Sequence, residues 1–248
     1  MDIRDFTKQP DTPSDPSKIK VLLVDDHKLV TEGLARLLAD EADIDVIGCA
    51  ESGEQAMELL EQVSPDVILM DVKMPGIGGI EATQRIIQRN ALARVVGMSS
   101  IDVGVIPSRM LAAGARAFIT KSGGVDELLL AIRKVYAGQH YVTPSVATKL
   151  GTDPFAKKSR GGVRRKVLFD RLSKRELQIA MALSDGSKVS AIAELLNISP
   201  KTVYTYRYRI FEKLGIKSDV ELTILAMKNG VCETSEDYIA YGEQRQLG

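Results

Sequence analysis

Five short apolar runs alternate with amphipathic stretches between residues 19 and 138, and this alternation restricts the possible folds more than any other feature of the sequence. The apolar runs predict strands at residues 19–24, 44–50, 66–70, 94–98 and 115–120. The other stretches place apolar residues three and four positions apart and predict helices at residues 29–40, 53–62, 79–88, 105–114 and 125–138. Buried strands that alternate with helices are typical of a parallel sheet covered on both faces. Residues 19–140 are therefore predicted to form a five-stranded, doubly wound α/β domain.

The sequence from Leu172 onward has a helical periodicity throughout. Short amphipathic stretches lie at residues 172–186, 188–197, 199–215 and 218–230. Four short helices are enough for a small all-α domain, which we predict over residues 171–230.

Three segments lack this periodicity. Residues 1–18 are rich in Pro, Asp and Ser and residues 231–248 are mostly polar, so both are predicted to be disordered tails. Residues 141–170 are predicted to hold a helix remnant and a linker, because Gly, Pro and a basic run at 157–166 break the pattern. The basic run is interpreted either as a solvated hinge or as a further contact to a phosphate backbone.

The charge is balanced overall, with 33 basic and 33 acidic residues, but it is unevenly distributed. Residues 19–148 hold 12 basic and 17 acidic side chains, whereas residues 149–220 hold 16 basic and 7 acidic ones. Only the second region is therefore predicted to attract an anionic polymer such as a nucleic acid.

The ends of the chain and its cysteines bear on location. The first residues lack the apolar core of a secretory signal, and no apolar run is long enough to span a bilayer. We expect a cytoplasmic protein with no membrane partner. Cys49 and Cys232 have no second metal ligand near them in sequence, which favours buried or idle thiols.

Polar residues follow four of the predicted strands at the point where each strand ends. Asp25 and Asp26 follow the first strand, Asp71 the third, Ser99 the fourth and Lys121 the fifth. Ligands of open parallel sheets collect at the carboxyl ends of the strands, so these side chains are expected to converge on one crevice. Each residue alone is readily explained as a helix cap or a surface residue. The combination in this order favours a site.

Three carboxylates placed close together repel one another unless a cation joins them, and Mg²⁺ is the hard cation that commonly serves phosphate chemistry. With Mg²⁺ held by the carboxylates, Asp71 is predicted to act as the nucleophile and become an aspartyl phosphate. Lys121 would pair with a phosphoryl oxygen, and the hydroxyl of Ser99 would donate a hydrogen bond to another.

Ser199 and Pro200 are typical of a helix start, with Ser as the cap and Pro in the first turn. The helix is predicted to run from Pro200 to Leu214 and to end at Gly215. Only Ile198 and Ser199 separate it from the preceding predicted helix, a turn short enough for a helix-turn-helix unit.

The side chains of this helix suggest what it binds. Its buried stripe is predicted to be Val203, Ile210 and Leu214, with Tyr206 partly in the core. Basic, Tyr and Thr side chains on the other faces suit the major groove of DNA. These are Lys201, Tyr204, Thr205, Arg207, Tyr208 and Arg209. The alternative is a solvated, Tyr-rich helix in a protein-binding bundle.

The segments VLLVDDHKLV, DVILMDVKMPGIGGIEA and AGARAFITKS resemble the response-regulator receiver family, a flavodoxin-like fold, from residue 19 to about residue 138. The resemblance implies a phosphoacceptor at Asp71. It implies Mg²⁺ bound directly by Asp26 and Asp71 and by the backbone carbonyl of Lys73, with Asp25 in support. It further implies a switch pair, in which Ser99 moves toward the phosphate and Phe118 turns inward.

Two departures from the receiver pattern concern loops. Ser122 follows Lys121 where many receivers have Pro, so a cis peptide there is not assured. Gly and Pro in the segment after Ser99 disfavour a helix, so the sequence does not determine whether the fourth predicted helix forms.

Residues 172–228 resemble the LuxR/FixJ (NarL-type) helix-turn-helix family through LSKREL, IAELLNISPKTVYTY and KLGIKSDVEL. The resemblance implies base contacts from Tyr204, Thr205 and Tyr208, and DNA-backbone contacts from Lys201, Thr202 and Arg209. The long segment from Ser199 together with DVKMPGIGGIEAT is most similar to the GacA/UvrY/SirA/LetA group of global activators. That group implies a hybrid sensor histidine kinase as phosphodonor and promoters of small regulatory RNA genes as targets.

These features lead to one hypothesis with two alternatives. The chain is predicted to be a non-enzymatic response regulator, in which phosphorylation of Asp71 produces a homodimer that binds double-stranded promoter DNA and activates transcription by RNA polymerase. Virulence or secondary-metabolism regulons are the expected outputs. The alternatives are an aspartyl-phosphate phosphatase, for which the spacing of Asp25 and Asp26 is wrong, and a receiver-based adaptor that binds protein.

Overall fold

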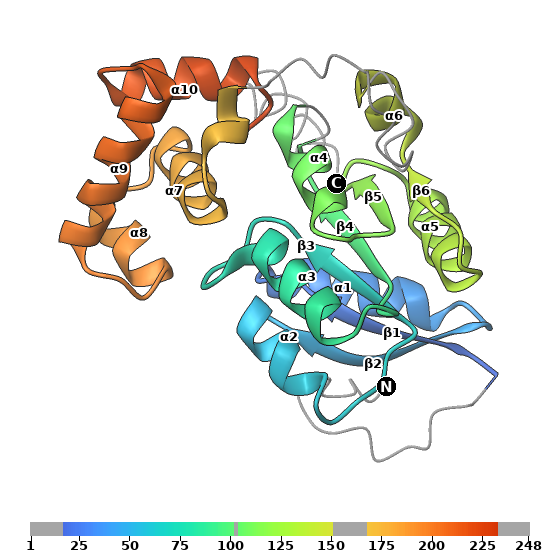
Figure 1. The fold of residues 1–248 in the computed structure, drawn as a ribbon. Helices are drawn as coiled ribbons and strands as arrows, with labels where there is room; N and C mark the ends of the chain where they lie inside the picture. Colours follow the sequence, from blue (N-terminus) through green and yellow to red (C-terminus); the bar gives the residue numbers. More distant parts are fainter. Residues whose placement is uncertain (1–16, 102–103, 151–167, 233–248) are drawn as a thin grey trace. The chain divides into compact units, whose positions relative to one another are not determined.

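The computed structural model describes residues 17–101, 104–150 and 168–232. The chain divides into two compact units, one built around a sheet and one made of helices (Figure 1). The predicted tails at 1–18 and 231–248 and the basic run at 157–166 lie wholly or mostly outside the described residues.

The first unit is built on a parallel sheet with strand order β2-β1-β3-β4-β5-β6. Five strands match the predicted ones, and the parallel α/β prediction is confirmed. They are β1 (Ile19–Val24), β2 (Ile44–Ala50), β3 (Val67–Asp71), β4 (Val95–Ser99) and β5 (Ala117–Thr120). The predicted number of strands is wrong, because a sixth strand, β6 (Tyr141–Val142), pairs in parallel with β5. A two-residue strand is too short to produce a periodic sequence signal.

Helices cover both faces of this sheet. They are α1 (Lys28–Ala39), α2 (Gly53–Leu59), α3 (Gly78–Arg89), α4 (Val105–Ala112) and α5 (Val125–Tyr136), followed by the short α6 (Pro144–Leu150). The apolar side chains of α1 and α5 share one core cluster with alternate residues of β1, β3, β4 and β5. On the other face, Met110 of α4 lies against Gly97 of β4, and Thr83 of α3 donates a hydrogen bond to the Met110 sulfur. The sheet is therefore doubly wound, as predicted.

The second unit contains the four predicted helices. They are α7 (Lys174–Ser184), α8 (Val189–Leu195), α9 (Pro200–Leu214) and α10 (Asp219–Lys228), and a 3₁₀ turn, η1 (Leu168–Arg171), precedes them. Apolar side chains from every one of these elements are fully buried, among them Phe169 of η1, Ile179 of α7, Ile192 of α8 and Leu222 of α10. Val203, Ile210 and Leu214 form the buried stripe of α9, as predicted.

The bounds of α9 follow from its two ends. The Ser199 hydroxyl accepts a hydrogen bond from the backbone N–H of Thr202, and Gly215 has a φ of 69°, the left-handed conformation that ends a helix. The turn before it is longer than predicted, with four residues, 196–199, instead of two. Asn197 adopts a φ of 51°, and the N–H of Ile198 donates to the Ala193 carbonyl, which ends α8 early.

Two smaller expectations concern the cysteines and the membrane. Neither cysteine forms a disulfide; Cys232 is buried, and burial raises the pKa of Cys49 to about 11, so its thiol stays protonated. Among the residues described by the structure, no helix has the length and apolar character required to cross a membrane.

Candidate functional site

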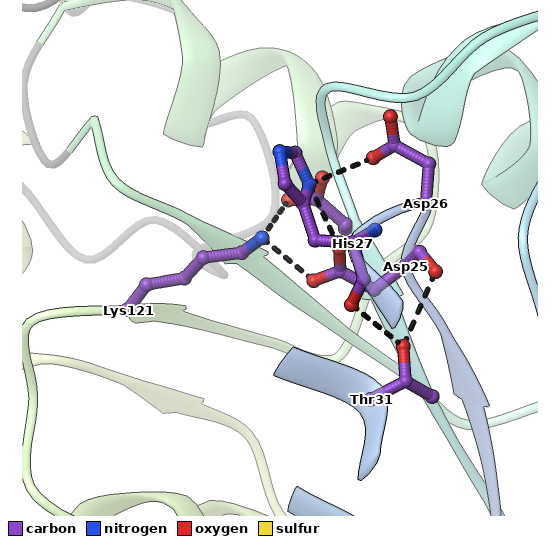
Figure 2. Close-up of polar contacts among 6 residues, drawn as sticks. Asp25, Asp26, His27, Thr31 and Lys121 are labelled. Atoms are coloured by element: carbon purple, nitrogen blue, oxygen red, sulfur yellow. Dashed lines mark hydrogen bonds and ion pairs between the residues drawn. The ribbon is translucent and has the colours of Figure 1, made fainter. Parts of the chain in front are cut away.

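Two buried carboxylates and one lysine meet at the carboxyl end of the sheet. Asp25 and Asp71 are 1% and 2% exposed, and the side chain of Lys121 reaches both of them. Its Nζ atom lies 2.6 Å from Asp25 Oδ2 (Figure 2). The same atom lies 3.1 Å from Asp71 Oδ1. The structure therefore brings together these residues from three separate strand ends, as their positions in the sequence suggested.

Strand pairing explains this convergence. Asp71 is the last residue of β3 and pairs with Met98 of β4, one residue before Ser99. The backbone N–H of Lys121 donates to the Ser99 carbonyl, which fixes the start of the β5–α5 loop beside the end of β4. The lysine side chain consequently begins at the same sheet edge as the carboxylates. The hydroxyl-bearing Ser99 is itself buried there.

The charges of Asp25, Asp71 and Lys121 affect one another. Burial raises the pKa of Asp71 to about 7; Lys121 opposes this rise, and the negative charge of Asp25 adds to it. Burial alone would lower the pKa of Lys121, but the carboxylates of Asp71 and Asp25 outweigh it and raise that pKa. A single ammonium group is thus shared by two acidic groups, and a further cation would stabilise the ionised form of Asp71.

The donor atoms fit such a cation. Asp25, Asp26, His27 and Asp71 each place one ligand atom so that all four lie within 4.8 Å of one another. The buried Oδ1 atom of Asp26 accepts no hydrogen bond from the described residues, although His27 Nδ1 lies 3.1 Å away. Carboxylate oxygens are the ligands that Mg²⁺ prefers. The residues of this chain therefore suit the predicted divalent ion.

His27 and Thr31 belong to this neighbourhood but were not predicted. The backbone N–H of His27 donates to Asp25 Oδ1 at 2.9 Å, and the Thr31 hydroxyl donates to the backbone carbonyls of Asp25 and His27 (Figure 2). These bonds hold the loop between β1 and α1. The order Asp-Asp-His was visible in the sequence, whereas the Thr31 bonds needed the position of the helix start.

Phe118 and Ser99 are both buried in this structure. Phe118 is 0% exposed, and a Cβ added to Gly97 would lie only 3.2 Å from its ring. The ring of Phe118 is therefore fully buried against β4, and the predicted movement of the switch pair stays a prediction. The metal contact of the Lys73 carbonyl also stays a prediction. No cis peptide occurs within the described ranges, so the bond after Lys121 is trans.

In the second unit, five of the predicted DNA-contacting side chains share one face of α9. Lys201, Tyr204, Thr205, Tyr208 and Arg209 are all exposed, at spacings of three and four residues. The tyrosines are the most prominent apolar groups of this face, with 56% and 71% of their surfaces exposed. The cations and hydroxyl groups of this helix face suit the hydrogen-bonding groups of a DNA groove, and its rings offer apolar contact.

Arg207 does not belong to this face. Its guanidinium donates two hydrogen bonds to Asp219 of α10, at 2.7 and 2.5 Å, and lies 4.7 Å from the ring centre of Phe211. Such a bidentate, stacked arginine joins α9 to α10. Thr202 is half-buried, and its hydroxyl lies 2.8 Å from that of Ser199. The predicted DNA contacts of these two residues stay predictions, and for Arg207 the structure favours a packing role.

Glu176 is a buried acidic residue that the sequence interpretation missed. It completes a capping box with Ser173 at the start of α7, and its Oε2 also accepts a bond from Lys213 of α9 at 2.7 Å. Burial works to raise its pKa, but the bonds from Lys213 and Ser173 prevail and lower it. Glu176 therefore ties α9 to α7.

Known proteins match both units of the chain. Residues 21–133 match the response regulator receiver domain family, and residues 170–226 match the luxR family of bacterial regulatory proteins. The response regulator GacA of Pseudomonas aeruginosa is 45% identical over 217 residues, which cover 88% of this chain and 99% of that protein. The response regulator UvrY of Escherichia coli is 42% identical over 214 residues, covering 86% and 96%.

A solved structure of the RcsB response regulator of Salmonella typhimurium shares the fold, with a TM-score of 0.65 at 22% identity over 86% of this chain and 99% of that one. The chain belongs to the response regulators that join a receiver domain to a LuxR-type helix-turn-helix domain, and within them to the group of GacA and UvrY.

Proposed function

We propose that this response regulator is switched by phosphorylation of Asp71, with a sensor histidine kinase, of the hybrid type, as phosphodonor. The observation that carries the proposal is the buried Asp71 carboxylate beside Lys121 and the acidic pair of Asp25 and Asp26. In the transfer, an Asp71 oxygen forms a bond to phosphorus while the bond from phosphorus to the kinase's histidine nitrogen breaks.

The chain's own residues assist this transfer. Mg²⁺, held by Asp25, Asp26, Asp71 and the Lys73 carbonyl, would neutralise charge on the phosphoryl group. Lys121 exchanges its contact with the Asp71 carboxylate for one with a phosphoryl oxygen, and Ser99 donates its hydroxyl to another. The movement of Ser99, coupled to the ring of Phe118, is proposed as the step that carries the signal out of the receiver.

The output is sequence-specific binding of promoter DNA by α9. Tyr204, Thr205 and Tyr208 are proposed to contact base edges, while Lys201 and Arg209 contact phosphates. Helix-turn-helix proteins commonly bind two half-sites about one turn of DNA apart, so the DNA-binding form is proposed to be a homodimer. By resemblance to the GacA group, the targets are small regulatory RNA genes transcribed by RNA polymerase. The protein would act in the cytoplasm and turn over no external substrate.

The phosphorylation step is tested by incubating wild type, Asp71→Asn and Asp66→Asn with Mg²⁺ and acetyl phosphate. Asp66 lies at the opposite end of β3, where its carboxylate accepts a bond from the backbone of Lys20, so it serves as a matched control. Intact-mass measurement should show one added phosphoryl group on wild type and Asp66→Asn, removed by hydroxylamine, and none on Asp71→Asn. Equal phosphorylation of all three would place the phosphoacceptor elsewhere.

A further inference from the structure

We infer that His27 supplies a nitrogen ligand beside the carboxylates of Asp25, Asp26 and Asp71. The site would then bind borderline first-row transition-metal ions such as Ni²⁺ through this imidazole, a ligand that Mg²⁺ does not use. The inference rests on the proposed metal site and deepens it by naming a second class of cation. It stands on the position of one imidazole nitrogen relative to the carboxylates.

The distances are those of neighbouring ligands around one ion. His27 Nδ1 lies 3.1 Å from Asp26 Oδ1 and 3.3 Å from Asp25 Oδ1. Ligand atoms at the usual bond length of about 2.0–2.1 Å from a transition metal are themselves roughly 3 Å apart. The Asp71 carboxylate lies within the same group of atoms, no pair of which is more than 4.8 Å apart. One ion can therefore meet the imidazole and the carboxylates with little movement.

The local backbone already orients the imidazole. The His27 N–H donates to Asp25 Oδ1, and its carbonyl accepts bonds from the N–H and hydroxyl of Thr31, so the residue is fixed at both sides of its Cα. The side chain itself is 65% exposed, which leaves an ion a path from solvent. Lys121 occupies the other oxygen of Asp25, Oδ2, and leaves Oδ1 toward the imidazole.

The chemistry of the ligands separates the two classes of cation. Mg²⁺ selects oxygen ligands and retains water, so it gains little from an imidazole. Imidazole suits Ni²⁺, Zn²⁺ and Cu²⁺, whose affinity for mixed nitrogen and oxygen sites exceeds that of the harder ions. The imidazole would bind through an unprotonated Nδ1, with its proton on Nε2. Such an ion would compete with Mg²⁺ for the carboxylates that phosphorylation needs.

Calorimetric titration of the untagged full chain with Ni²⁺ and, separately, with Mg²⁺ tests the inference. The variants are His27→Gln, His140→Gln and Asp71→Asn; the chain has only two histidines, so His140→Gln is the matched control. We expect His27→Gln to weaken Ni²⁺ binding by about 10-fold or more and to change Mg²⁺ binding less than about two-fold. His140→Gln should change neither, and Asp71→Asn should weaken both.

Each other outcome has a separate meaning. Unchanged Ni²⁺ binding by His27→Gln overturns the inference and leaves the proposed Mg²⁺ site intact. An equal loss of Ni²⁺ and Mg²⁺ binding in this variant also overturns it, because His27 would then shape the loop instead of binding the ion. If Asp71→Asn weakens neither ion, the metal site of the proposed function is itself wrong.

Discussion

The ammonium group of Lys121 lies closer to Asp25 than to Asp71, the proposed phosphoacceptor, at 2.6 Å compared with 3.1 Å. Both carboxylates are buried, and among the described side chains Lys121 forms an ion pair with each of them. Lys121 thus bridges the two carboxylates, and in the proposed phosphorylation its flexible side chain is able to follow the new charge on Asp71.

Removal of this charge should destabilise the receiver. Lys121→Met leaves two buried carboxylates without their ammonium partner and is expected to lower the free energy of unfolding by about 3 kcal/mol at pH 8 without metal. Chemical denaturation measures the loss, with Lys28→Met, an exposed lysine of α1, as the control. A loss no larger than that of the control would mean that the stability of the receiver does not depend on the charge of Lys121.

The raised pKa of Asp71 makes the metal-free protein sensitive to pH. A carboxyl whose pKa rises from 3.8 to about 7 on folding binds its proton more tightly in the native state. The contribution of Asp71 to the free energy of unfolding is most favourable at low pH and is lost as the pH rises from about 4 through 7. Asp71→Asn should therefore raise the melting temperature in EDTA by several degrees at pH 8 and by much less at pH 5. An equal effect at both pH values would contradict a raised pKa.

Glu176 should stabilise the helical domain with the opposite dependence on pH. The pKa of Glu176 is lowered on folding. Its contribution to the free energy of unfolding is therefore present above the ordinary carboxyl pKa and is lost as the pH falls through the lower native pKa. Glu176→Ala removes the capping box and the partner of Lys213, and we expect a loss of about 1–3 kcal/mol at pH 7.

A double-mutant cycle with Lys213→Ala separates the two parts of this loss. Coupling between Glu176 and Lys213 should be measurable at pH 7 and disappear in acid. Additive losses at pH 7 would show that the cap acts alone.

Arg207 and Arg209 should differ in their effects on DNA binding. Arg209→Gln removes an exposed charge from the proposed DNA face and should reduce the slope of log affinity against log salt by about 1. Arg207→Gln breaks the fork with Asp219, so it should lower the stability of the domain while the salt slope changes little. Fluorescence anisotropy at several salt concentrations distinguishes the two variants. An equal reduction of the salt slope in both variants would identify Arg207 as a phosphate contact.

The sequence predicted the features that depend on periodicity or on strand ends. The bounds of α9 followed from Ser199, Pro200 and Gly215, and the meeting of Asp25, Asp71 and Lys121 followed from their positions at strand ends. In contrast, β6 is too short to give a pattern, and Asn197 ends α8 through a left-handed turn that a non-glycine residue rarely adopts.

Contacts between distant residues could not be predicted in this way. Glu176 is one member of a capping box in the sequence, but its bond to Lys213 spans 37 residues and depends on how α7 packs against α9. Arg207 is of a residue type that commonly contacts DNA. Only the position of α10 showed that its guanidinium donates to Asp219. Side-chain partners of this kind are set by tertiary packing, which one sequence does not encode as a local pattern.

The most direct test of the phosphorylation switch is the DNA affinity of wild type and Asp71→Asn, measured by anisotropy with a labelled duplex that the protein has selected from random sequences. Both proteins are measured in Mg²⁺ with and without beryllofluoride, a mimic of the phosphoryl group. The account predicts that the mimic tightens binding by wild type at least several-fold and leaves Asp71→Asn unchanged. Equal affinities in all four measurements would contradict control of DNA binding by Asp71.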